Sequence, residues 1–237
     1  LDQYGVPEFL NKRDAFLFKM YQAFGHHFDF IAIPIIKKRL RMDTSQVIIN
    51  EERPQLTKHL ATRFKEKIGQ NVNLLGEVVL GNEEADHRYH HYLEALESPD
   101  INYISVKISG IYAQTHALNY EESFPELVSR MSALYQKAID FPYTDEDGIK
   151  RSKFINLDME EYKDAHFTLR LFKAVLNLPQ FKNYSAGIVV QAYLPDAYDF
   201  QTELLEFAKA RIDGGGAPIK MRLVKGCNLE METVISS

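Results

Sequence analysis

Residues 214–226 read Gly-Gly-Gly-Ala-Pro-Ile-Lys-Met-Arg-Leu-Val-Lys-Gly, and this stretch decides the fold of the chain. A turn signal leads into a short apolar run, which predicts a strand buried against helices. Arg222 and Lys225 stand at the carboxyl end of that strand. Ligands of parallel α/β folds collect at the carboxyl ends of the strands, so these cations indicate an anionic or electron-rich ligand. For this stretch alone, the alternative is a strand with two solvated charges.

Four more apolar runs precede this strand, and each is followed by an amphipathic segment. Strands are expected at 72–77, 103–108, 154–159 and 187–193, and helices at 83–96, 124–139, 167–178 and 204–211. Strands that alternate with helices indicate parallel βαβ units, and therefore an α/β fold. The middle of each run is apolar, as is typical of a parallel strand covered on both faces. Asn82 is expected to cap the first of these helices.

The first 69 residues show a different pattern. Apolar residues recur at roughly helical spacing between Phe9 and Phe24, and further amphipathic segments follow at 31–40 and 56–68. No strand pattern occurs before Gln70. We therefore expect a helical arm or subdomain over residues 1–69, ahead of a main fold over residues 70–237.

The composition narrows the class of protein. The chain has 237 residues with 45% hydrophobic content, which is enough to bury a large core and fits one α/β barrel or two small domains. Its net charge of -5 argues against a broad nucleic-acid footprint. The single cysteine excludes an internal disulfide framework. The longest apolar stretch, 28–36, is much shorter than the roughly 20 residues that cross a bilayer. Because the sequence does not begin with Met, we expect a fragment of a longer polypeptide.

Polar residues close each of the five predicted strands. In chain order they are Glu77, Lys107, Asp158, Gln191, and then Arg222 with Lys225. If the strands are parallel, these side chains converge on one face, which is how barrel enzymes build sites from several strands. A buried lysine and aspartate near each other can hold a zwitterionic substrate, whereas each alone is costly to bury.

Metal and phosphate sites are the weaker alternatives. His87 and His91 lie four residues apart on a predicted helix and could share a zinc ion, but no cysteine lies nearby, so a solvated face is favoured. The charged, turn-rich segment 141–153 lacks the closing glutamate of a calcium loop and is expected to be a solvated loop. The glycines at 214–216 precede a strand and not a helix, which is the wrong order for a phosphate cradle.

Five short motifs share one order with a known family. They are NVNLLGE at 71–77, ISVKIS at 104–109, NLDMEEY at 156–162, VQAY at 190–193 and IKMRLVKG at 219–226. Together they resemble the proline dehydrogenase family, in particular the domain found in bifunctional proline utilization A proteins. The resemblance implies a distorted (βα)8 TIM-like barrel, represented here by its first five βα units after the helical segment.

The resemblance also implies an activity. Members of the family oxidise L-proline to Δ1-pyrroline-5-carboxylate by hydride transfer to FAD. By resemblance, Lys107 contacts the proline carboxylate and Asp158 lies by the amine. Glu77 resembles a glutamate that pairs with a substrate-binding arginine and helps to close the site.

The cofactor residues are implied in the same way. Gln191 and Arg222 are expected to hydrogen-bond to the isoalloxazine ring, and Val224, Lys225 and Gly226 to line the flavin. A hydrogen-bond donor near the ring agrees with this role, because it supports the charge of the reduced flavin. No metal is implied.

Further expectations concern the parent protein. The family passes its electrons to a membrane quinone, which implies a cytoplasmic protein with peripheral association at the inner membrane, or a mitochondrial one in a eukaryote. Bifunctional members carry a C-terminal aldehyde dehydrogenase domain, the L-glutamate γ-semialdehyde dehydrogenase. After Val234 the family continues with three more strands and a helix with paired arginines that clamp the carboxylate. Since five strands cannot close an eight-stranded barrel, the chain alone is expected to be inactive.

Two other functions stay open at this point. The chain could be a non-catalytic structural or binding remnant of such a barrel, although a remnant has no need to retain charges in a core. It could also belong to another barrel enzyme, such as an aldolase that uses Lys107 as a Schiff base.

Overall fold

The computed structural model describes residues 12–24, 29–44, 48–49, 53–74, 81–113, 120–226 and 229–236. The chain divides into two compact units, Leu1–His59 and Leu60–Ser237. The three helices expected at the start of the chain are present as α1 (Lys12–Phe24), α2 (Asp29–Thr44) and α3 (Arg53–Lys65). Within the described residues no strand precedes Val72, and no helix there is long and apolar enough to span a membrane.

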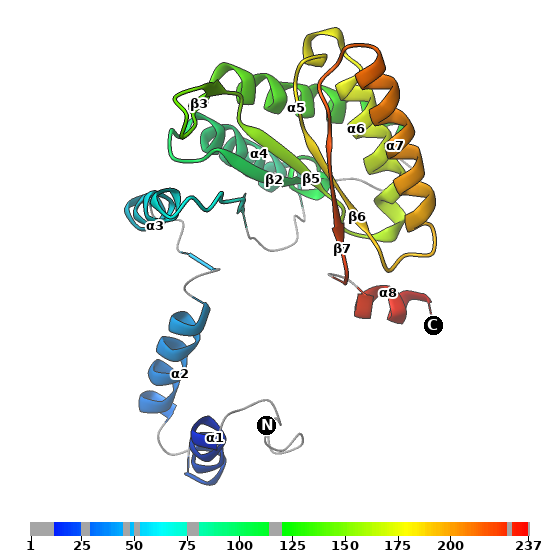
Figure 1. The fold of residues 1–237 in the computed structure, drawn as a ribbon. Coiled ribbons are helices and arrows are strands. Elements are labelled where there is room, and N and C mark those ends of the chain that lie inside the picture. The colour runs from blue at the N-terminus through cyan, green and yellow to red at the C-terminus, as the bar shows by residue number, and fades with distance from the viewer. Residues whose placement is uncertain are drawn as a thin grey trace. The chain divides into compact units, whose positions relative to one another are not determined.

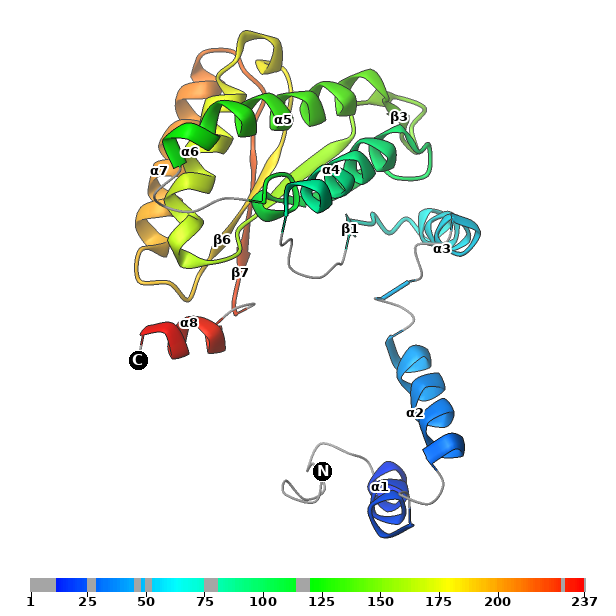
Figure 2. The same ribbon diagram turned by 180° about the vertical axis from the view of Figure 1, so that it is seen from behind.

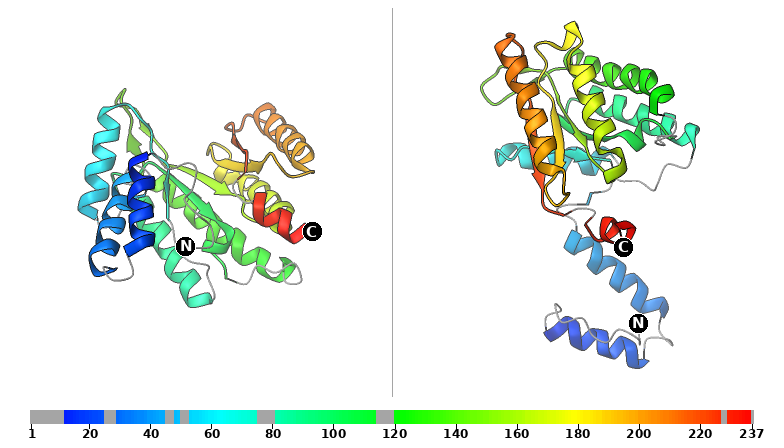
Figure 3. Two further views of the ribbon diagram at one scale, coloured as in Figure 1. Left: turned by 90° about the horizontal axis from the view of Figure 1, so that it is seen from below. Right: turned by 90° about the vertical axis from the view of Figure 1, so that its right-hand side faces the viewer.

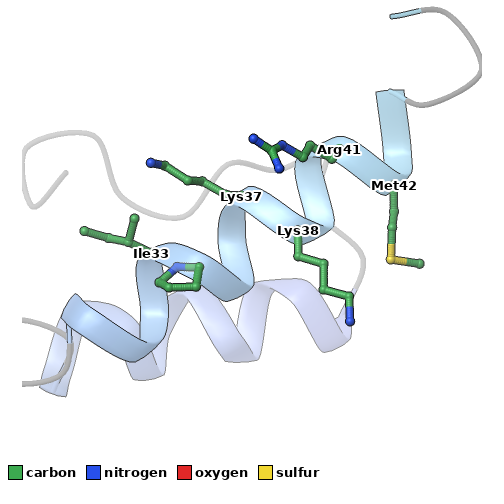
Figure 4. Close-up of a pocket in the computed structure, with 6 residues that line it drawn as sticks. Ile33, Lys37, Lys38, Arg41 and Met42 are labelled. Atoms are coloured by element: carbon green, nitrogen blue, oxygen red, sulfur yellow. The ribbon is translucent and has the colours of Figure 1, made fainter. Parts of the chain in front are cut away.

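The first unit carries a basic hollow on α2. Its described lining is Ile33, Pro34, Lys37, Lys38, Arg41 and Met42. Lys37 and Arg41 lie one turn apart and extend from the same side of the helix, whereas Lys38 extends from another side (Figure 4). This hollow combines aliphatic side chains with three cations.

The second unit is built on a five-stranded sheet, and its strand directions confirm the prediction from sequence. The strands are β1 (Val72–Asn73), β2 (Tyr103–Lys107), β5 (Phe154–Asp158), β6 (Gly187–Gln191) and β7 (Lys220–Val224). They lie in the order β1-β2-β5-β6-β7, and every neighbouring pair is parallel. The strands are shorter than expected. β2, for example, ends at Lys107 because Ile108–Gly110 forms a 3₁₀ turn, η2.

Helices follow the strands along the chain. They are α4 (Asn82–Glu97), α5 (Tyr120–Asp140), α6 (Ala165–Leu176), α7 (Ala197–Asp213) and α8 (Leu229–Ser236). α4 to α7 all lie on the same side of the sheet (Figures 1 and 2), and Figure 3 gives two further views of this layering. The expected cap of α4 is wrong, because Gly81 is the N-cap and Asn82 is already helical, with no side-chain cap hydrogen bond.

The two faces of the sheet differ in chemistry. Alternate side chains of a strand point to opposite faces, and in β2, β5 and β6 the members of one set are apolar and fully buried under the helices: Ile104, Val106, Ile155, Leu157, Ile188 and Val190. In β7, Leu223 of the same set is 55% exposed. On the other face lie Ser105, Lys107, Asn156, Asp158, Gln191 and Arg222. The polar strand ends were expected on one face, but the expectation of strands that are apolar in the middle fails at Ser105 and Asn156, which stand in the middle of β2 and β5 on that face.

Segment 141–153 folds back on itself, contrary to the expectation of a plain loop. It contains the strands β3 (Tyr143–Thr144) and β4 (Lys150–Arg151), which pair antiparallel in a separate sheet. Asp145 Oδ1 accepts the backbone N–H groups of Asp147 and Ile149 at 3.0 and 2.8 Å. A hydrogen bond from Arg151 lowers the pKa of Asp145, and those two backbone bonds lower it further. The carboxylate of Asp145 therefore shapes a turn.

One lysine is buried at the start of β5. Only 2% of Lys153 is exposed, and its ammonium group donates to the carbonyl of Ser98, the residue that ends α4. Burial lowers the pKa of Lys153 to about 8. A cation suits this place because the carboxyl end of a helix carries partial negative charge.

The glycine run at 214–216 ends α7. Gly215 N–H donates to Ile212 O and Gly216 N–H to Arg211 O, each at 2.8 Å. These are the two hydrogen bonds of a Schellman motif, which places one residue in the left-handed region. Gly215 fills that position, with φ of 74°. The run is a helix stop, in agreement with its interpretation as a connection.

Gly215→Ala is therefore expected to lower the free energy of unfolding by about 1 kcal/mol, because a side chain disfavours the left-handed backbone. Gly69→Ala is the matched control, since an added Cβ there meets nothing within 4 Å and the backbone is not left-handed. Urea denaturation of both variants checks this. Equal stability of the two would contradict the role given to Gly215.

Candidate active site

The core of the polar face is an ion pair between two strands that are not neighbours. Arg222 Nη2 of β7 lies 2.7 Å from Asp158 Oδ1 of β5. β6 lies between them and presents Val189 as the register partner of Arg222. Because valine is short, the long arginine side chain can reach across β6 to the carboxylate. The pair joins the middle of the sheet to its β7 edge.

Two more donors meet the same carboxylate oxygen. Asn156 Nδ2 lies 2.6 Å from Asp158 Oδ1, and Ser105 Oγ donates to it at 3.2 Å. Asn71 Nδ2 in turn donates to Ser105 Oγ at 2.9 Å. Burial raises the pKa of Asp158, whereas the charge of Arg222 and the hydrogen bonds from Asn156 and Ser105 oppose that rise. Asp158 is thus a buried carboxylate surrounded by donors that favour its charged form.

Lys107 pairs with a carboxylate beyond the end of β5. It is the register partner of Asp158 on the neighbouring strand, but its Nζ lies 3.2 Å from Glu160 Oε1. Among the described residues, Arg222 and not Lys107 forms the ion pair with Asp158. Lys107 and Glu160 are 35% and 26% exposed, so their ion pair is accessible to solvent.

Gln191 completes the cluster at the end of β6. Its Nε2 donates to the backbone carbonyl of Glu160 at 2.7 Å. Its Oε1 is buried and has no hydrogen-bond partner among the described residues, and the same holds for Arg222 Nε. Asn156 Oδ1, beside Asp158, is a further buried acceptor without a partner among the described residues. The cluster therefore presents acceptor and donor atoms that no described protein group satisfies.

The remaining predicted residues lie at the end of β7 or outside the described chain. Val224 is the register partner of Gln191, and Lys225 and Gly226 follow it as exposed residues. Glu77 lies outside the described residues, so its placement stays a prediction. The structure thus brings Lys107, Asp158, Gln191 and Arg222 to one face of the sheet.

Sequence reasoning missed three polar neighbours of this cluster, namely Ser105, Asn156 and Glu160. A signal for them existed. Each stands two residues from Lys107 or Asp158 along a strand or its extension, and side chains two apart lie on the same face of a strand. Period-two alternation, applied strictly, would have included them.

Two other clusters in the described part of the second unit were considered as sites. Among the described residues, no group of three His, Cys, Asp or Glu side chains could hold a metal ion. His87 and His91 stack with ring centroids 4.4 Å apart on α4. A hollow at the amino-terminal ends of the strands includes Tyr103, Phe154 and Lys220, and Lys220 Nζ lies 5.6 and 5.8 Å from the two ring centroids. This hollow lies at the opposite end of the strands from Asp158 and Gln191.

A parallel sheet with helices on one face and ionisable side chains at the carboxyl ends of its strands is the architecture of α/β barrel enzymes. The family model for proline dehydrogenase matches residues 56–237. The chain belongs to the proline dehydrogenase family, as its motifs indicated. A search among curated proteins gave no match.

Solved structures agree with this assignment. Proline utilization A from Corynebacterium freiburgense is 41% identical, with a TM-score of 0.75, over 84% of this chain and 20% of its own. The protein of the same name from Bdellovibrio bacteriovorus is 29% identical, with a TM-score of 0.72, over 86% and 22%. That from Bradyrhizobium japonicum, at 24% identity and a TM-score of 0.59, shares the fold. The chain therefore spans about a fifth of the length of these relatives.

Proposed function

We propose that this chain forms part of the catalytic domain of an FAD-dependent enzyme that oxidises L-proline to Δ1-pyrroline-5-carboxylate. The observation that carries the proposal is the ion pair of Arg222 with Asp158, together with the unsatisfied atoms Gln191 Oε1 and Arg222 Nε beside it. Buried polar atoms without partners are rare in proteins and indicate a missing group. Family membership supports the choice of proline as substrate.

A flavin fits these donors and acceptors. The edge of an isoalloxazine ring carries both acceptor atoms and an N–H donor. It would accept a hydrogen bond from Arg222 Nε and donate one to Gln191 Oε1. Val224, Lys225 and Gly226 follow on the same strand and would line the ring. When bound, FAD supplies the acceptor for the hydride that leaves proline.

The side chains of the chain itself would bind and orient the substrate. Lys107 would bind the proline carboxylate. Its side chain is partly exposed, and the ion pair described for it is with Glu160. Asp158 would lie by the amine, because its carboxylate offers an acceptor for an N–H donor. Glu77 is proposed to help close the site through a substrate-binding arginine.

The partners of the reaction are part of the same proposal. A quinone would take the electrons, through peripheral association of an otherwise cytoplasmic or mitochondrial protein with a membrane. The relatives named proline utilization A make a longer parent protein with an aldehyde dehydrogenase domain the natural setting for this chain.

Purification of the full-length protein tests the proposal. We expect flavin absorbance, bleaching of that absorbance by L-proline, and reduction of a soluble quinone analogue. Residues 1–237 alone should bind flavin poorly and lack turnover, because five strands do not close an eight-stranded barrel. A full-length protein without flavin would favour a non-catalytic remnant, and turnover by residues 1–237 would show that the domain ends earlier than proposed.

A further inference from the structure

Three donors converge on a single oxygen of Asp158. Asn156 Nδ2, Arg222 Nη2 and Ser105 Oγ lie 2.6, 2.7 and 3.2 Å from Oδ1. They come from three different strands, β5, β7 and β2. A carboxylate oxygen offers about two lone-pair sites, so three donors saturate it. None of these three hydrogen bonds ends on Oδ2.

The two uncharged donors are themselves held in place. Ser105 and Asn156 are fully buried and are register partners on β2 and β5. Ser105 Oγ accepts a hydrogen bond from Asn71 Nδ2 at 2.9 Å, which leaves its own hydrogen for Asp158. An added Cβ at Gly187, the register partner of Asn156 on β6, would lie 2.6 Å from Asn156 Oδ1. The glycine thus leaves room for the amide that points at the carboxylate.

We propose that Ser105 and Asn156 are positioning residues for Asp158: they fix its side chain through Oδ1 and so leave Oδ2 as the oxygen that meets a ligand. The inference rests on the proposed function for the nature of that ligand, the amine of proline. Two neutral donors suit this task because they favour the carboxylate without adding charge, whereas Arg222 also faces the flavin proposed above. Asn71 acts on Asp158 indirectly, because it donates a hydrogen bond to Ser105.

The charged groups that act on Asp158 are Arg222 of β7 and Lys107 of β2, and both lower its pKa. Besides burial, the charge of Asp158 itself raises the pKa of Tyr103 of β2 and of Tyr92 of α4, and Glu160, after β5, also raises that of Tyr92. Hydrogen bonds from Ser105 and Asn156 lower the pKa of Asp158 and so counter its burial. Removing either donor must raise that pKa, because a donor to the charged form favours that form.

The test uses Ser105→Ala and Asn156→Leu in the full-length protein. A hydrogen bond to a charged group is worth enough to move a pKa by about 1 unit. The acidic limb of the kcat/KM profile for proline should therefore shift to higher pH by about 1 unit with Asn156→Leu. Ser105→Ala should shift it less, because its hydrogen bond is longer. Ser105→Thr, which keeps the hydroxyl, should restore the original profile.

A second readout separates this inference from the proposed function. The pKa of Asp158 is followed without substrate by ¹³C NMR of aspartate-labelled protein, with the signal assigned through Asp158→Asn. If the protein does not oxidise proline, the proposed function fails, while a raised pKa in the two variants still supports the positioning role.

The control variant, Thr168→Val, removes a buried hydroxyl group on the opposite side of the sheet from Asp158. Thr168 Oγ1 donates to Asp164 O at 2.8 Å on α6, on the helical side of the sheet. Thr168→Val should lower stability but leave the pKa of Asp158 unchanged. If the core variants fail to fold, Asn71→Ala changes an exposed side chain and should produce a smaller shift in the same direction. An unchanged pKa of Asp158 in every folded variant, or an equal shift in Thr168→Val, would overturn the inference.

Discussion

Arg222→Met in the full-length protein is expected to lower the free energy of unfolding by roughly 1–3 kcal/mol and to reduce its flavin content. The Arg222 side chain is 37% exposed, so solvent screens part of its ion pair with Asp158. The stability loss follows from burial. Only 9% of Asp158 is exposed, and the variant leaves its carboxylate without the cation 2.7 Å away. A buried charge that loses its partner costs more than the pair contributed, because the remaining charge is not solvated. Thermal unfolding and the flavin absorbance of the purified variant measure the two effects.

A double variant separates the structural role of Arg222 from its role toward the flavin. Adding Asp158→Asn to Arg222→Met removes the unpaired charge and should recover much of the lost stability. Flavin content and the flavin reduction potential should stay low, since the donor to the ring is still missing. If the double variant regains flavin together with stability, Arg222 serves only to hold Asp158, and the cofactor role is wrong.

The strands and helices could be predicted from sequence because their signals are local. Each βα unit carries an apolar run of strand length and then a helical period, so β2, β5, β6 and β7 were placed to within a few residues. The hairpin of β3 and β4 was not foreseen, because two-residue strands have no periodicity to detect. Asn82 has the side chain of a helix cap, but the backbone places Gly81 in that position.

The sequence predicted charged residues on the polar face, but not which of them form ion pairs with one another. Parallel strands bring Lys107 and Asp158 together at the carboxyl ends of β2 and β5, as the sequence pattern indicated. Arg222 lies on the same face but in the middle of β7, and not at its carboxyl end as expected. The strand pattern places Lys107 next to Asp158 but does not decide which charged groups pair. The partner of Asp158 depends on the reach of an arginine over the small side chain of Val189, and Lys107 pairs with Glu160. These ion-pair partners depend on three-dimensional packing, which cannot be predicted from a local sequence pattern.

Lys107→Met in the full-length protein should raise the Michaelis constant for proline strongly while the flavin stays bound. Losing a charge-assisted hydrogen bond costs roughly 1.5–3 kcal/mol, which corresponds to a decrease of about ten- to a hundredfold in kcat/KM. Steady-state kinetics with proline and the flavin spectrum of the variant measure this. Lys107→Arg should lose less, because it keeps the positive charge near the carboxylate.

The alternative is that Lys107 has only a structural role, and Glu160→Gln is the control for it. Lys107 lies 3.2 Å from Glu160, so the lysine could simply tie β2 to the segment after β5. Ion pairs this accessible contribute about 0–1 kcal/mol, too little to explain a large change in kcat/KM. Glu160→Gln removes the same ion pair and leaves the backbone carbonyl that Gln191 binds. If the lysine binds the substrate carboxylate, Glu160→Gln should keep or lower the Michaelis constant, because Lys107 then has no competing anion at 3.2 Å. If both variants lower thermal stability alike and neither changes the proline kinetics, Lys107 is a structural residue and its assignment to the substrate must be abandoned.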